Sequence, residues 1–216
     1  MNSTDINLRR YVASDLTGHC RETLLDGGFD LVRQVFQGVD RQETADHMFG
    51  LPETDQELVV AFDDNEKIIG FAGIRQLILE RIKITYRVGT IVDPNHQGKG
   101  LYKRLICECL HPDSEAMVVR TQNPRVYQSI RSTGIFDRIY PGVDGKEVPR
   151  EIFETASEVL ELIGEKPISD PLRLIVRGAY GDGLYGEPIS CRSDDVNELF
   201  RQLGKGDGYV IIGMRS

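Results

Sequence analysis

Ile91-Val92-Asp93-Pro94-Asn95-His96-Gln97-Gly98-Lys99-Gly100-Leu101-Tyr102 is the stretch of the chain that predicts most about its fold. The run from Ile82 to Val92 is rich in β-branched residues, which is typical of a buried strand. Pro94 ends that strand because proline has no N–H to give to a neighbouring strand. From Lys99 onward, apolar residues recur at helical spacing: Leu101, Leu105, Ile106 and Cys109. The stretch therefore predicts a strand, a glycine-rich turn and a helix in direct succession.

The turn itself has the composition of an anion-binding site. Gly98 and Gly100 let the backbone bend sharply and approach a ligand without a Cβ in the way. The helix that follows presents unpaired N–H groups and the positive end of its dipole, next to Lys99 and Lys103. Such a turn can hold a phosphate or a pyrophosphate. An ordinary connection between a strand and a helix, without a ligand, is the alternative.

This segment resembles motif A of the GCN5-related N-acetyltransferases (the GNAT family), in which Val-x-Pro precedes Gln/Arg-x-x-Gly-x-Gly/Ala. Val92-Asp93-Pro94 and Gln97-x-x-Gly100 match, and Tyr102 stands at the final Gly/Ala position. The resemblance implies that a main-chain N–H near Ile91 or Val92 holds the thioester carbonyl of acetyl-CoA. It also implies that the pyrophosphate is bound by the amides of Gln97, Gly98, Lys99, Gly100, Leu101 and Tyr102. The Tyr102 side chain either stacks on the cofactor or crowds its groove.

A second segment resembles GNAT motif B, Asn-x-x-Ala-x-x-x-Tyr-x-x-x-Gly-Phe, and follows a short apolar strand. Asn123 is a good N-cap before Pro124, and Gly134 stands where a left-handed C-cap glycine belongs. By resemblance Asn123 contacts the pantetheine arm, although a role as a cap alone is the alternative. Ile130 occupies the position of the tyrosine that protonates the CoA thiolate in many members. Tyr127, one turn earlier, is the substitute that we predict, and a packing role is its alternative.

The base that deprotonates the amine is predicted from the strand before the turn. Many family members place a Glu six residues before Val92, where this chain has Tyr86 followed by Arg87. A tyrosine has an unperturbed pKa near 10, so Tyr86 is a weak base unless Arg87 or burial changes its pKa. For Arg87 itself, the more common role beside a strand is that of a surface ion-pair partner.

The order of the predicted elements agrees with this resemblance. A strand at 6–12 is followed by helical sequence at 23–49 that is interrupted at Gly27-Gly28 and Gly38, and then by strands at 58–62, 68–79 and 82–92. This order predicts an α/β (α+β) fold with a GNAT-like mixed, mostly antiparallel sheet flanked by helices. We predict a GNAT-like acyl-CoA-binding domain over residues 1–140. Residues 141–216 are predicted as a C-terminal extension packed on the same domain.

Three features of the extension are readable from the sequence. A helix is predicted over 149–163, a second helix follows Ser193, and a final strand is predicted over 209–212. Gly181 to Gly186 spell a literal G-x-G-x-x-G. Pro188 prevents a helix from continuing after it, so we interpret this segment as a surface or substrate-side loop and not as a dinucleotide site.

Composition limits the possible partners. The net charge is −8 and no basic block is present, which argues against nucleic acid as a main partner. No apolar run is long enough to span a membrane, and the first residues lack a signal peptide, so we predict a cytoplasmic protein with no membrane association. The four cysteines and four histidines show no metal-ligand spacing, and no metal is expected.

By resemblance, the predicted reaction is the transfer of an acetyl or related acyl group from acyl-CoA to the amine of a small molecule. The amine attacks directly in a ternary complex, without a covalent enzyme intermediate. Two alternatives remain: a catalytically silent CoA-binding or sensor protein, and an interaction module in which the groove is closed. The resemblance is also compatible with a homodimer.

Overall fold

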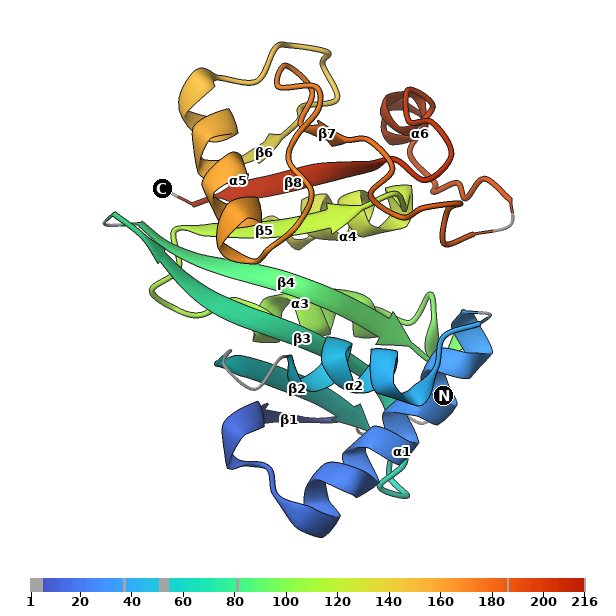
Figure 1. Ribbon diagram of the computed structural model, residues 1–216. Helices are drawn as coiled ribbons and strands as arrows, with labels where there is room; N and C mark the ends of the chain where they lie inside the picture. The colour runs from blue at the N-terminus through green and yellow to red at the C-terminus, as the bar shows by residue number, and fades with distance from the viewer. Residues whose placement is uncertain (1–5, 37, 51–54, 81, 186, 216) are drawn as a thin grey trace. The chain divides into compact units, whose positions relative to one another are not determined.

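The computed structural model describes residues 6–36, 38–50, 55–80, 82–185 and 187–215. The chain forms two compact units: Met1–Gln76 with Arg87–His111, and Leu77–Tyr86 with Pro112–Ser216. Two long strands, β3 (Ile68–Leu79) and β4 (Ile82–Val92), each contribute residues to both units. The chain therefore passes between the units within β3, within β4 and again between His111 and Pro112. Figure 1 labels the elements of both units.

The first unit is a sheet with helices on both faces. Its strand order is β1 (Asn7–Val12), β2 (Gln56–Phe62), β3, β4, with β1–β2 and β2–β3 antiparallel. Helices α1 (Gly18–Val35) and α2 (Arg41–Phe49) lie on one face, and α3 (Leu101–Cys109) lies on the other. Two glycines of β3 mark these faces, because an added Cβ at Gly73 would meet α2 and one at Gly70 would meet α3. Short 3-10 turns follow β1 (Ala13–Asp15) and β4 (Pro94–His96).

The apolar face of α1 shows why one sequence prediction was wrong. Helix α1 continues through Gly27 and Gly28, where an interruption was predicted. At Gly28 an added Cβ would lie 2.3 Å from the sulfur of Met48, so this glycine lets α1 approach α2 closely. Asp40 caps α2, since its carboxylate accepts a hydrogen bond from the Glu43 amide at 2.7 Å. The core beneath both helices consists of apolar side chains from α1, α2, β2 and β3.

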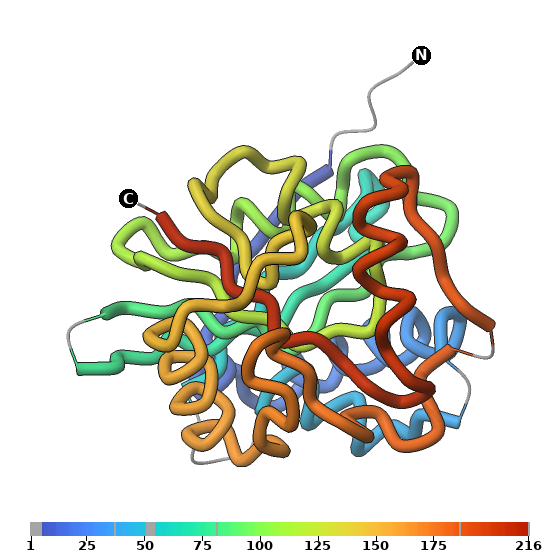
Figure 2. Tube along the Cα trace, turned by 90° about the horizontal axis from the view of Figure 1, so that it is seen from above, coloured from blue at the N-terminus to red at the C-terminus, as the bar shows by residue number. Residues whose placement is uncertain are grey.

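The second unit contains the end of the β3–β4 hairpin followed by the rest of the sheet. Its strand order is β4, β5 (Ala116–Thr121), β8 (Gly208–Met214), β6 (Arg138–Tyr140), and the two-residue β7 (Ile175–Val176) also pairs with β8. All the β8 pairings are antiparallel. The helices are α4 (Pro124–Thr133), α5 (Arg150–Leu162) and α6 (Asp194–Phe200). Figure 2 follows the chain from α5 through the orange loops to α6 and β8.

The predicted fold class is confirmed: a mixed, mostly antiparallel sheet flanked by helices. The predicted helix at 149–163 and final strand at 209–212 are present as α5 and β8, with boundaries shifted by one or two residues. The predicted domain boundary at residue 140 stays a prediction. The two compact units are defined by contacts within each unit, and they alternate along the chain.

Candidate cofactor-binding turn and catalytic residues

The turn after β4 is held by its own backbone and by one buried carboxylate. The Asp93 amide donates to the Ile69 carbonyl at 2.9 Å, and the Asp93 carboxylate accepts from the Asn95 amide at 2.7 Å. That second bond caps the 3-10 turn that begins at Pro94, so the prediction that Pro94 ends the strand is confirmed. The Gln97 side chain donates to the Val92 carbonyl at 3.3 Å. These bonds fix the path of the chain into α3.

Two glycines shape the second half of the turn. Gly98 and Gly100 have φ values of 73° and 83°, which is the left-handed region that glycine tolerates best. Gly100 is the N-cap of α3, so the helix starts at Leu101, two residues later than the predicted start at Lys99. An added Cβ at either glycine would meet no described atom within 4 Å. The glycines therefore serve the backbone conformation, and the first amides of α3, which lack intrahelical acceptors, can receive an anion.

Arg87 and Tyr102 contact each other, and the burial of Arg87 contradicts one prediction. Arg87 is 1% exposed, so the predicted role of a surface ion-pair partner is wrong. Its Nη2 donates to the Tyr102 hydroxyl, and its guanidinium carbon lies 5.2 Å from the centre of the Tyr102 ring. Tyr102 is the second residue of α3, and its ring is directed at Arg87. Stacking of Tyr102 on a cofactor, or crowding of the cofactor groove by it, stays a prediction.

In the second unit, Tyr86 lies near a cluster that the sequence did not reveal. Tyr86 is buried, and it interacts electrostatically with Arg120 of β5 and with Tyr180. Arg120 forms an ion pair with Glu165, and its guanidinium carbon lies 4.9 Å from the centre of the Tyr180 ring. Burial raises the pKa of Tyr180, against the opposing effect of Arg120. The cation near Tyr86 on this side of the strand is thus Arg120, since successive strand residues such as Tyr86 and Arg87 point to opposite faces.

The Asn123 side chain makes two hydrogen bonds. Its side-chain oxygen accepts from the Arg125 amide at 2.9 Å, which confirms the N-cap of α4. Its Nδ2 donates to the Tyr185 hydroxyl at 3.2 Å. Contact with a pantetheine arm stays a prediction. Tyr185 belongs to the loop that contains the G-x-G-x-x-G sequence, so this loop reaches the N-terminus of α4.

Tyr127 is buried in the second unit and its hydroxyl already has an acceptor. The hydroxyl donates to the Pro141 carbonyl at 2.9 Å, and the ring packs edge-on against Phe200 with centroids 6.2 Å apart. Burial raises the pKa of Tyr127 to about 12. Ile130 is also buried on α4. The role of Tyr127 as a general acid stays a prediction, and these contacts favour the packing alternative.

Two further classes of site, those for metal ions and for membranes, concern residues 6–36, 38–50, 55–80, 82–185 and 187–215. In that part of the chain, no group of three or more His, Cys, Asp or Glu side chains could hold a metal ion. Within the same residues, no helix is long and apolar enough to cross a membrane.

Comparison with known proteins finds a family match for part of the chain. Residues 26–116 match the model of the acetyltransferase (GNAT) family. No curated protein matches the chain. Similar solved structures include a GCN5-related glucosamine N-acetyltransferase region of a fungal multi-domain GH3 β-N-acetylglucosaminidase (TM-score 0.47, 15% identity, 74% of this chain and 21% of that chain). The matched part is thus about a fifth of that fungal protein.

Two further structures have a similar degree of likeness. One is the aminoglycoside N-acetyltransferase AAC(6')-Iy in complex with CoA (TM-score 0.37, 16% identity, 50% of this chain and 68% of that chain). The other is an acetyltransferase of the GNAT family from Staphylococcus aureus Mu50 (TM-score 0.44, 16% identity, 68% and 88%). The family match spans α2 and β2 through α3 and includes the glycine turn. The chain is thus similar to the acetyltransferase (GNAT) family over residues 26–116, which is less than half of its length.

Proposed function

We propose that this protein transfers an acetyl or related acyl group from acyl-CoA to the amine of a small molecule. The observation that carries this proposal is the turn between β4 and α3. Gly98 and Gly100 there adopt the left-handed conformation, and the N-terminus of α3 follows at once, inside the segment that matches an acetyltransferase family. The combination is suited to the pyrophosphate of CoA, because helix N-termini bind phosphate groups through their free amides and dipole.

The proposed chemistry is direct attack in a ternary complex. The amine nitrogen attacks the thioester carbonyl, which a main-chain N–H near Ile91 or Val92 polarises, and the C–S bond then breaks to release CoA. Tyr86 is the proposed base that accepts the amine proton. Its electrostatic interaction with the Arg120 guanidinium is the observation that supports this assignment. Tyr127 is the proposed donor of the proton to the CoA thiolate.

A second candidate function has an observation in its favour. The Tyr127 hydroxyl donates to the Pro141 carbonyl, and Ile130 stands where many relatives have the tyrosine that acts as acid. A protein without an effective acid would bind CoA and turn it over slowly or not at all. This arrangement favours a silent CoA-binding or sensor protein as the alternative.

The proposal extends to the setting of the reaction. The net charge of −8 suits a cationic amine as acceptor more than an anionic one. We propose a cytoplasmic protein that acts without nucleic acid or membrane and is able to form a homodimer. Light scattering of the purified protein measures the last of these directly.

The test is the thermal stability of three proteins with and without acetyl-CoA: the wild type, Gly100→Glu and Gly145→Glu. Gly145 is the matched control because its φ is 71° and an added Cβ there also meets no described atom within 4 Å. Both variants should lose similar stability without ligand. At about 100 times its dissociation constant, acetyl-CoA should stabilise the wild type by about 2.7 kcal/mol, which is several degrees.

The expected outcome is a ligand shift in the wild type and in Gly145→Glu that Gly100→Glu lacks. A panel of amines, with release of the CoA thiol as the signal, then separates the enzyme from the silent CoA-binding protein. The absence of any acetyl-CoA shift in the wild type contradicts both functions. An equal shift in all three proteins would place the ligand away from this turn.

A further inference from the structure

Arg87 is a buried charged residue to which the proposed reaction gives no role. It is among the largest fully buried side chains of the described residues and lies in the middle of β4. Its Nη2 donates to the Tyr102 hydroxyl, whereas its Nε and Nη1 are buried without a hydrogen-bond partner. A buried donor without a partner costs free energy, and a guanidinium has five N–H groups to satisfy.

No described residue forms an ion pair with Arg87. Among the ion pairs of residues 6–36, 38–50, 55–80, 82–185 and 187–215, none includes Arg87. Its two titratable neighbours are neutral at physiological pH. Burial raises the pKa of the Cys109 thiol to about 12, and burial also raises the pKa of Tyr102. An arginine cannot lose its proton in a protein, so the positive charge remains.

The position of this charge connects it to the glycine turn. Tyr102, which receives the Arg87 hydrogen bond, belongs to the first turn of α3, directly after Leu101 and the N-cap Gly100. Arg87 thus holds the side chain of a residue whose own amide is among the free N–H groups of the helix N-terminus. An uncompensated buried charge is unfavourable by itself but strengthens the binding of an opposite charge nearby, because a low-dielectric interior screens it weakly.

We propose that Arg87 is a positioning residue for an oxyanion bound at the N-terminus of α3. Through its hydrogen bond to Tyr102 it holds the first turn of the helix, and its positive charge attracts the anion. This inference rests on the proposed function, because that function identifies the oxyanion as the pyrophosphate of CoA. A free phosphate or pyrophosphate has the same chemistry, and the experiment distinguishes these sources.

The pairing also accounts for a departure from the family pattern. Tyr102 stands at a position where motif A has Gly or Ala, and Arg87 follows the position where many relatives have a catalytic Glu. The two departures contact each other, through one hydrogen bond and through the guanidinium that lies over the ring. Each one thus supplies the partner that the other requires.

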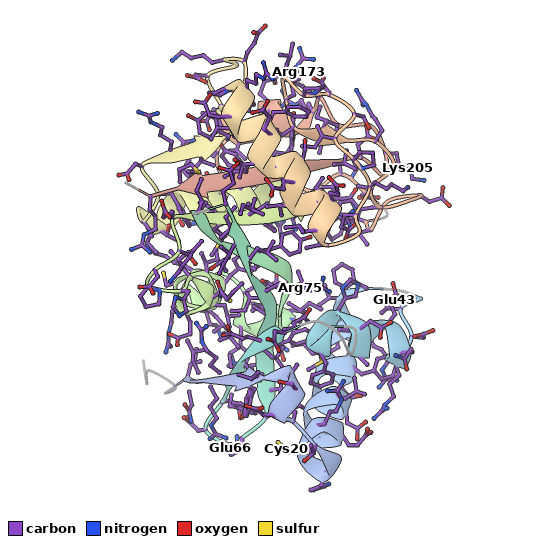
Figure 3. The ribbon with its side chains drawn as sticks, turned by 60° about the vertical axis from the view of Figure 1, so that its left-hand side comes forward. Cys20, Glu43, Glu66, Arg75, Arg173 and Lys205 are labelled. Atoms are coloured by element: carbon purple, nitrogen blue, oxygen red, sulfur yellow. The ribbon has the colours of Figure 1, made fainter. Side chains whose placement is uncertain are left out.

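The experiment measures binding and stability separately in five proteins. The wild type is compared with Arg87→Met, Arg87→Gln, Tyr102→Phe and the control Arg75→Met. Arg75 lies on β3 of the same unit (Figure 3), and its Nε donates to the Gln56 side chain at 3.2 Å, so the control removes a charge that has an ordinary partner. Inorganic pyrophosphate and acetyl-CoA are titrated by calorimetry, and the melting temperature is measured without ligand.

We expect Arg87→Met to melt no lower than the wild type and to bind pyrophosphate about tenfold more weakly, which corresponds to about 1.4 kcal/mol. Arg87→Gln gives the same loss of affinity if the methionine variant fails to fold. Tyr102→Phe should lose affinity to a smaller extent because the charge remains. The Arg75 control should bind as the wild type does. A purely structural Arg87 would instead lower the melting temperature and leave the dissociation constant unchanged.

The two ligands separate this inference from the proposed function. Binding of pyrophosphate that depends on Arg87, without binding of acetyl-CoA, supports the inference and contradicts the proposed function. Binding of acetyl-CoA and pyrophosphate with equal affinity in the wild type and both Arg87 variants overturns the inference and leaves the proposed function intact. A wild type that binds neither ligand overturns both.

Discussion

Replacement of Tyr127 by phenylalanine tests whether this residue acts as an acid or as a packing group. The variant keeps the ring that packs edge-on against Phe200 and removes only the hydroxyl. That hydroxyl donates to the Pro141 carbonyl at 2.9 Å inside the second unit, where both residues are buried. The substitution therefore leaves a buried carbonyl without this donor.

The expected loss follows from that one bond. A buried polar group that loses its partner costs about 1–3 kcal/mol. In a chain of this length each kcal/mol corresponds to about 2–4 °C in melting temperature. Tyr209 provides a matched control, because its hydroxyl also donates to a buried backbone carbonyl, that of Leu199, at 2.9 Å. Burial raises the pKa of Tyr209 to about 12, as it does for Tyr127.

Calorimetric unfolding and a transfer assay together provide the readout. On the packing interpretation, Tyr127→Phe and Tyr209→Phe should lose similar stability and retain similar turnover with any acceptor that the amine panel identifies. The reasoning is refuted if Tyr127→Phe keeps the wild-type melting temperature. A selective loss of kcat in Tyr127→Phe, with a normal affinity for acetyl-CoA, would instead support the acid.

The same pair of variants has a pH signature. In both residues the pKa in the folded state, about 12, lies above the unfolded value of about 10, so the folded protein binds these protons more tightly. The stability that this difference contributes is complete below pH 10 and is lost as the pH rises from about 10 to about 12. Each phenylalanine variant should lose less stability than the wild type over this interval.

Two further predictions concern turns. Gly206→Ala should be strongly destabilising, because φ there is 81° and the new Cβ would lie 1.9 Å from the Gly181 carbonyl oxygen. Gly98→Ala, where φ is 73° and no described atom lies near the new Cβ, should lose only about 1–2 kcal/mol for the left-handed conformation. Equal losses of stability in denaturant titrations of the two variants would contradict the role of the Gly181 contact. Asp93→Ala removes the carboxylate that accepts a hydrogen bond from the Asn95 amide. The variant should lose about 0.5–2 kcal/mol of folding stability and bind acetyl-CoA more weakly. Unchanged affinity in a calorimetric titration would show that this cap does not position the turn.

The features that sequence reasoning predicted correctly depend on neighbouring residues. The turn at Gly98 and Gly100 was predictable because two glycines, a preceding proline and a following apolar stripe all lie within about ten positions. The same is true of α4, whose N-cap Asn123 and C-cap Gly134 both take the predicted conformations. Local chemistry decides these positions, since a cap or a left-handed residue needs only its own backbone.

The features that it missed depend on partners far along the chain. Gly28 looked like an interruption of a helix, but its reason is Met48, twenty positions later. Arg87 was predicted to be exposed because its neighbours in the sequence do not indicate the contact with Tyr102, fifteen positions later. The cluster around Arg120 joins β5 to Glu165 and Tyr180, residues that no family motif connects. A single sequence contains no signal that would have paired these residues.

The place of β8 has a consequence for how the protein is made. β8 is the last element in chain order, yet in the second unit it lies between β5 and β6 and also pairs with β7. Until Gly208–Met214 leave the ribosome, β6 and β7 lack the neighbour with which they pair. During synthesis β6 and β7 thus remain unpaired with β8, which is translated about seventy residues after β6. We expect nascent chains that stop before Gly208 to bind chaperones and to resist aggregation poorly.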